Sequence, residues 1–130
     1  MDALASGVVG PLVERNPELA ATMDDWIRSD NVWLARSALI HQLSFKQRTD
    51  SERLFRYCML RGGDDEFFIR KAIGWILREA ATRETDRVVA FVAPRARRLS
   101  GVTWREATRK LPARERQPLD AKRSRMTGRS

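Results

Sequence analysis

A repeat of 34 residues constrains the fold of this chain more than any other feature of its sequence. Residues 30–43, DNVWLARSALIHQL, align with residues 64–77, DDEFFIRKAIGWIL, when they are shifted by 34 positions. Four of the fourteen aligned positions are identical. A period in the mid-thirties is typical of solenoids that stack pairs of antiparallel helices. The repeat therefore favours a helical solenoid.

Helix start and stop signals recur along the chain at a similar spacing. Asn16-Pro17, the capping box from Thr49 to Glu52, and the pair Gly62-Gly63 mark the ends of short helices. The predicted helices are 3–15 with a kink at Gly10-Pro11, 17–28, 31–43, 50–60, 66–81, 84–93 and 103–111. No segment shows the alternation of a strand. The sequence predicts an all-α chain, a HEAT-like helical-repeat solenoid of about seven short helices.

Length and charge indicate the domain organisation and the class of partner. A chain of 130 residues is long enough for one compact domain and too short for two. Six of the Arg and Lys residues and two acids lie in 112–130, which leaves half of the net charge of +8 to the rest. We expect one domain over 1–111 and a basic, disordered tail over 112–130. The charge favours a polyanionic partner, nucleic acid before an anionic membrane surface.

The residue types that are scarce exclude several kinds of site. Cys58 is the only cysteine and His41 the only histidine, which excludes an internal disulfide, a cysteine-rich metal site and a zinc site of several histidines. The sequence has no apolar run of membrane-spanning length, no phosphate-binding loop and no basic region of a secretory signal. We expect a cytoplasmic protein without a metal or cofactor, whose chemistry uses carboxylates, cations and aromatic rings.

Arg36 lies in the middle of the apolar stripe of its predicted helix. Its helical neighbours on that face are Val32, Trp33, Leu39, Ile40 and Leu43. A guanidinium there needs a carboxylate, a carbonyl or a phosphate, because burying an unpaired charge is prohibitive. Two interpretations stay open. One is a salt bridge to an acid on another helix, for which the candidates are Asp2, Asp24, Asp25 and Asp30. The other is phosphate binding.

Trp75 lies on the side of its predicted helix that faces away from the core stripe. That stripe consists of Ile69, Ile73, Ile76, Leu77 and Ala80. Trp75 instead follows Lys71 by one turn and precedes Arg78 by about one turn. The indole either packs on a neighbouring helix or lies on an open cationic surface, where the two cations would hold phosphates and the ring would pack on sugar or base.

Three segments together resemble the DNA alkylation repair family of AlkD-like glycosylases. They are DDWIRSDNVWLARSALIHQLSFKQRTD (24–50), EFFIRKAIGWILREAA (66–81) and WREATRKL (104–111). The resemblance extends over nearly all of residues 2–111. It implies a HEAT-like solenoid whose concave, basic face holds duplex DNA, and a monomer that needs no metal.

The resemblance also implies an activity, the hydrolysis of the N-glycosidic bond of alkylated purines, typically 3-methyladenine and 7-methylguanine, as in base excision repair. The methylated base already carries the charge of a good leaving group. One carboxylate beside the sugar can then stabilise the oxocarbenium character that develops and position the attacking water. Glycosylases generally extrude the base into a pocket, whereas this family is understood to act without such a pocket.

The family's active cluster contains a tryptophan, an aspartate four residues later, an arginine and a second tryptophan. By motif match the aspartate is Asp2, the arginine is Arg36 and the second tryptophan is Trp75. Lys46 and Arg78 match further cationic positions that contact DNA. Lys71 is added to these DNA-contacting residues from the helical geometry alone, without a match in the family.

The chain departs from the family at its start, because the first tryptophan of the cluster would precede Met1. About half of a typical member would then be absent, and we expect a truncated solenoid. A valine codon read as a start site would explain this, and a degenerate gene or a naturally short relative would explain it equally. Two alternatives to an active glycosylase therefore remain, a non-catalytic DNA-binding remnant and a helical-repeat module for protein interaction.

Overall fold

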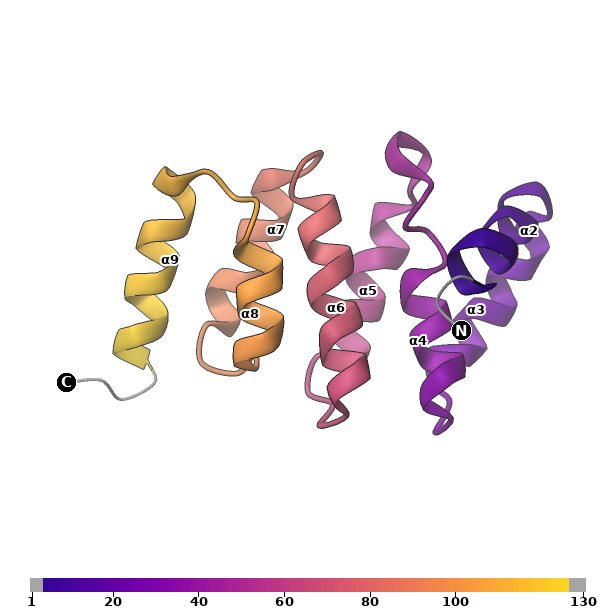
Figure 1. The fold of residues 1–130 in the computed structure, drawn as a ribbon, viewed down its shortest axis with the longest axis horizontal. Coiled ribbons are helices and arrows are strands. Elements are labelled where there is room, and N and C mark those ends of the chain that lie inside the picture. Colours follow the sequence, from indigo (N-terminus) through magenta and orange to yellow (C-terminus); the bar gives the residue numbers. More distant parts are fainter. Residues whose placement is uncertain (1–3, 127–130) are drawn as a thin grey trace.

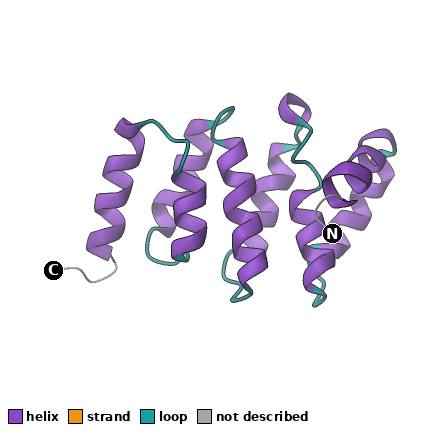
Figure 2. Ribbon diagram, in the orientation of Figure 1, coloured by secondary structure: helices purple, strands orange, loops and turns teal. Residues whose placement is uncertain are grey.

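The computed structural model describes residues 4–126, and within this range it contains eight α-helices and no strand (Figures 1 and 2). The α-helices are α2 (Gly10–Arg15), α3 (Ala20–Trp26), α4 (Val32–Ile40), α5 (Ser51–Arg61), α6 (Phe67–Ala80), α7 (Thr85–Val92), α8 (Gly101–Thr108) and α9 (Ala113–Met126). Short turns of other helix types are η1 (Ala5–Val9), η2 (Pro17–Leu19), η3 (Lys46–Arg48) and η4 (Ala93–Arg95). The prediction of an all-α, helical-repeat fold is confirmed. No helix among these residues combines the length and the apolar character needed to cross a membrane.

The helices stack in two rows. α4, α6 and α8 form one row, and α3, α5 and α7 lie behind it (Figure 1). Each helix of the first row pairs with the one that precedes it in the chain, and α6 packs on both α4 and α8. The two repeated segments thus fall on α4 and α6, which occupy equivalent places in successive pairs. Equivalent packing explains why the sequence repeats there.

Close approach between α6 and α8 depends on a glycine. A Cβ added to Gly74 would lie 2.7 Å from Cβ of Glu106, closer than carbon atoms pack. The five residues of the predicted α6 core stripe are all buried, and so are Trp104 and Ala107 of α8. Because α6 packs on both neighbours, its position fixes the face that it leaves open to solvent.

In the N-terminal segment, η1 runs directly into α2 at Gly10, where the sequence predicts a kink. η1 is a π-helical turn, and the N–H of Gly10 donates to the carbonyl of Ala5. Pro11 follows without a backbone N–H of its own. A Cβ at Gly10 would lie 2.3 Å from the carbonyl oxygen of His41, so only glycine lets this segment lie against the end of α4.

Residues 113–126 form helix α9, where the sequence analysis expected a disordered tail, and for this stretch the expectation is wrong. Leu119 is buried in the core. Asp120 accepts a hydrogen bond of 2.8 Å from Nε1 of Trp104. Arg123 donates to the carbonyls of Ala96 and Leu99, at 2.9 and 2.8 Å. The sequence gave no clear sign of this docking, because Leu119 is the only apolar side chain that the core buries among residues 113–125.

Candidate nucleic-acid interface

α6 presents a continuous line of aromatic and cationic side chains on the face that does not enter the core. Its members, spaced one helical turn apart, are Phe67 and Phe68, then Lys71, Trp75 and Arg78; we refer to them as the α6 stripe. Phe67, Phe68 and Trp75 expose 48%, 43% and 37% of their surface. Three large rings in one line are more apolar surface than a solvated helix face normally exposes.

Arg36 lies buried beneath this stripe, with 4% of its surface exposed. Its Nη1 donates a hydrogen bond to the carbonyl of Phe68, one of the three kinds of partner that its apolar surroundings demand. The guanidinium carbon lies 5.8 Å from the ring centroid of Phe68 and 5.8 Å from that of Trp75. The structure thus brings together Arg36 and Trp75, two of the three predicted catalytic residues.

Asp2, the third, lies outside the described residues. Among the acids that the sequence offered as partners of Arg36, Asp24 instead binds Arg53, Arg56 and Tyr57.

An aromatic cluster extends the stripe onto α4, and the sequence analysis did not predict it. The ring of Trp33, 42% exposed, lies with its centroid 5.5 Å from that of Phe68. Phe67 and Phe68 lie equally close to each other, and Nζ of Lys71 is 5.8 Å from the centre of the Phe67 ring. The 34-residue repeat held a signal for this cluster, because it aligns Trp33 with Phe67.

The loop after α4 carries Lys46 in an unusual backbone conformation. Its φ angle is 55°, the only positive value at a non-glycine residue among those the structure describes. Both ends of the loop are fastened by Gln42, which is buried. Its amide donates to the carbonyl of Asp50 at 3.2 Å, and its carbonyl accepts from the N–H of Asp50 at 2.7 Å. Backbone strain of this kind persists where the surroundings impose it, and it gathers at functional sites.

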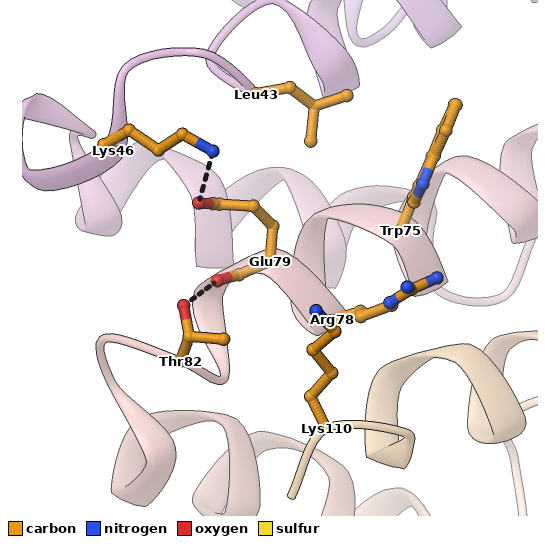
Figure 3. Close-up of a pocket in the computed structure, with 7 residues that line it drawn as sticks. All are labelled: Leu43, Lys46, Trp75, Arg78, Glu79, Thr82 and Lys110. Carbon is orange, nitrogen blue, oxygen red and sulfur yellow. Dashed lines mark hydrogen bonds and ion pairs between the residues drawn. The ribbon is translucent and has the colours of Figure 1, made fainter.

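A groove of about 330 Å³ runs beside the C-terminal half of α6 (Figure 3). We call it the α6 groove; its lining consists of Leu43, Lys46, Trp75, Arg78, Glu79, Thr82 and Lys110. Three cations and one carboxylate line it, so its net charge is positive. Nζ of Lys46 lies 3.9 Å from Oε2 of Glu79, and Nη1 of Arg78 lies 3.3 Å from Oε1 of Glu106.

His41 is a structural residue and not a cationic contact. It is 1% exposed, its Nδ1 lies 2.7 Å from the carbonyl of Ala38, and burial lowers its pKa. Between residues 4 and 126, no three His, Cys, Asp or Glu side chains gather as a metal site would require.

Comparison with known proteins agrees with this geometry. The family model described as "DNA alkylation repair enzyme" matches residues 1–111. The chain belongs to this family. It is also similar to a solved structure, a "Predicted DNA alkylation repair enzyme from Enterococcus faecalis", with a TM-score of 0.68 and 29% sequence identity. The match covers 78% of this chain and 47% of that one, so the chain spans about half the length of the solved relative. No curated protein matches.

The family resemblance stated from the sequence is thereby confirmed. The family match ends at Leu111, between α8 and α9, so α9 lies outside it.

Proposed function

We propose that this chain acts in DNA repair as a glycosylase, hydrolysing the N-glycosidic bond of alkylated purines such as 3-methyladenine and 7-methylguanine in duplex DNA. One observation supports this most strongly. Arg36, Phe68 and Trp75 form a packed cationic and aromatic unit at the surface of a member of the DNA alkylation repair family. On this proposal the solenoid is of the HEAT type and the chain is a monomer.

The chemistry of the stripe suits a nucleic acid. Cations hold phosphates, and exposed rings pack on sugars and bases, whatever the base sequence. Lys71 and Arg78 on α6 and Lys46 on the neighbouring loop therefore contact the phosphate backbone. Arg36 is fixed by the Phe68 carbonyl and the two rings, so it meets a phosphate near the lesion without first losing side-chain freedom.

The proposed reaction needs few groups because the lesion is already cationic. As the bond from C1′ to the base nitrogen breaks, its electron pair moves to the base, which leaves as a neutral molecule. The sugar gains positive charge, which the carboxylate of Asp2 stabilises. Water then adds to C1′ and loses a proton. Trp75 packs against the backbone at the lesion and keeps the sugar beside that carboxylate. No metal or cofactor enters these steps.

The decisive experiment measures the release of free methylated purines from alkylated duplex DNA by the purified chain and by Asp2→Asn. Release that disappears in the variant is the expected result. Duplex binding without release from either protein would overturn the glycosylase assignment in favour of a DNA-binding module. Absence of both binding and release would leave the interaction with another protein as the function of this helical repeat.

A further inference from the structure

We propose that Lys110 is a further DNA-binding cation, which joins Lys46 and Arg78 in the α6 groove and contacts the same phosphate backbone. The inference rests on the proposed function, since it takes duplex DNA as the ligand. Lys110 lies in one of the segments that resemble the family, 104–111, but the resemblance assigned DNA contacts to Lys46 and Arg78 only. Only the packing of α8 on α6 brings it to the groove.

The three cations reach the groove from different parts of the chain. Lys46 comes from the loop after α4, Arg78 from α6 itself, and Lys110 from the turn that follows α8 (Figure 3). Lys46 and Lys110 enter from opposite sides of Arg78. Trp75 lines the same groove, so a strand that passes the aromatic stripe continues into it.

Among the described residues that line the groove, Glu79 is the only carboxylate, and its placement leaves the groove able to accept an anion. It lies 3.9 Å from the ammonium of Lys46, which is 64% exposed, and it also binds Arg83, which is 13% exposed. Such a long, exposed pair contributes little free energy. A phosphate can therefore draw Lys46 from Glu79, because Arg83 still neutralises the carboxylate.

Arg78 and Lys110, the two other cations of the groove, are also placed to bind a phosphate. Arg78 is fixed by Glu106 of α8, a residue that also lies 3.7 Å from Arg109. Lys110 is exposed, as a residue that meets a phosphate in solution must be. The groove is thus a preformed concavity with one fixed and two movable cations.

The test compares Lys110→Ala with a matched variant, Arg98→Ala. Both remove one cation from an exposed position, but Arg98 precedes the N-terminus of α8, whereas Lys110 follows its C-terminus. Duplex affinity is measured by fluorescence anisotropy between low and moderate salt. We expect Lys110→Ala to weaken binding several-fold and to reduce the slope of log Kd against log salt by about one. Arg98→Ala should change the slope much less.

A further variant guards against a misfolded protein. Glu79→Gln removes negative charge from the groove and should tighten duplex binding, whereas a damaged fold would loosen it. Thermal unfolding of every variant, followed by circular dichroism, checks the fold independently.

The outcomes separate the two proposals. If the unaltered chain binds duplex DNA and both cation variants behave alike, the groove assignment is wrong while the proposed function stands. If the unaltered chain does not bind duplex DNA, both proposals are overturned.

Discussion

Two cationic regions of this molecule use their charges in opposite ways. The first is the seam between α3 and α5, where Asp24 meets Arg53, Arg56 and Tyr57; we call it the α3–α5 seam. Nε of Arg53 lies 3.0 Å from the Asp24 carboxylate, and Nη2 of Arg56 lies 3.1 Å from it. Because Arg53 and Tyr57 donate hydrogen bonds to it, the pKa of Asp24 falls from its ordinary value of 3.8 to about 2.

The second region is the α6 stripe with its groove. Lys71 lies over a ring, Lys46 forms a long, exposed ion pair, and Arg78 pairs with Glu106 of α8. In the α3–α5 seam one carboxylate gathers three donors, and this joins one helix pair to the next. The contrast teaches that net charge does not identify a nucleic-acid surface. What distinguishes it is that its cations stand beside exposed aromatic rings.

The largest effect on this comparison is expected from replacing Arg36. Replacement by methionine keeps the shape of the side chain but removes the charge. We expect a loss of about 100-fold in base release, because the lesion strand loses its fixed contact. The melting temperature, measured by circular dichroism, should fall by only a few degrees. The matched variant Arg53→Met in the α3–α5 seam should do the reverse, lowering the melting temperature and leaving duplex binding unchanged. The same pattern from both variants would contradict the comparison.

The next largest effect concerns the stability of the α3–α5 seam. Asp24→Asn removes the charge that Arg53 and Tyr57 bind, and should lower the free energy of unfolding at pH 7 by about 1–3 kcal/mol. Since folding depresses the pKa of Asp24, its contribution is present above pH 4 and is lost as the pH falls towards 2. Urea titrations at several pH values should therefore show the two proteins converging below pH 3. A gap as wide at pH 2 as at pH 7 would rule out this account.

A smaller effect is expected at Trp75. Its replacement by alanine should weaken duplex binding about ten-fold, the usual contribution of one aromatic ring stacked on a nucleic acid. The free energy of unfolding should also fall, by about 1–3 kcal/mol, because nearly two thirds of the residue is buried. Met59→Ala on α5, where the side chain is 63% exposed, is the control and should leave binding intact. Equal binding by both variants would place the DNA elsewhere.

The smallest effect is expected at Lys46. There a change to glycine should raise the free energy of unfolding while it lowers the affinity for duplex DNA. Lys46→Gly relieves the positive φ angle and should raise the free energy of unfolding by up to about 1 kcal/mol. Lys46→Ala removes the same ammonium without that relief. Both variants should weaken duplex binding to a similar extent, and only glycine should stabilise the fold. Denaturant titration and anisotropy measure the two quantities. Stabilisation by alanine would show that the backbone of Lys46 is not strained.

Local sequence patterns predicted the presence of the helices more accurately than the residues at which they begin. The apolar stripe of residues 66–81 and the glycine pair at 62–63 located α6, whose side chains lie as its period requires. The caps shifted by one to three residues. Asn31, and not Asp30, caps α4, and Ser100 opens α8 before the expected Thr103. Neighbouring polar residues compete for the same backbone N–H groups, and the local sequence does not rank them.

The site was predictable only in part, for a similar reason. Arg36 and Trp75 stand out because each violates the apolar pattern of its own helix, and a violation can be read locally. Glu79 and Lys110 do not violate the local pattern, so the sequence around them gives no sign of a role in the site. Nothing near Lys110 along the chain indicates that the turn after α8 meets the loop after α4.

By itself, the sequence of this chain determined which segments before residue 112 are helical, that they repeat, and the family to which they belong. These properties follow from periodicity, caps and motifs, all of which act within a few residues. Only the tertiary structure decided that α9 docks through Leu119 and Asp120, and that Lys46, Arg78 and Lys110 share one groove. Such placements depend on how closely α6 approaches its neighbours, and that distance is set by packing at positions such as Gly74, far along the chain from the side chains that it brings together.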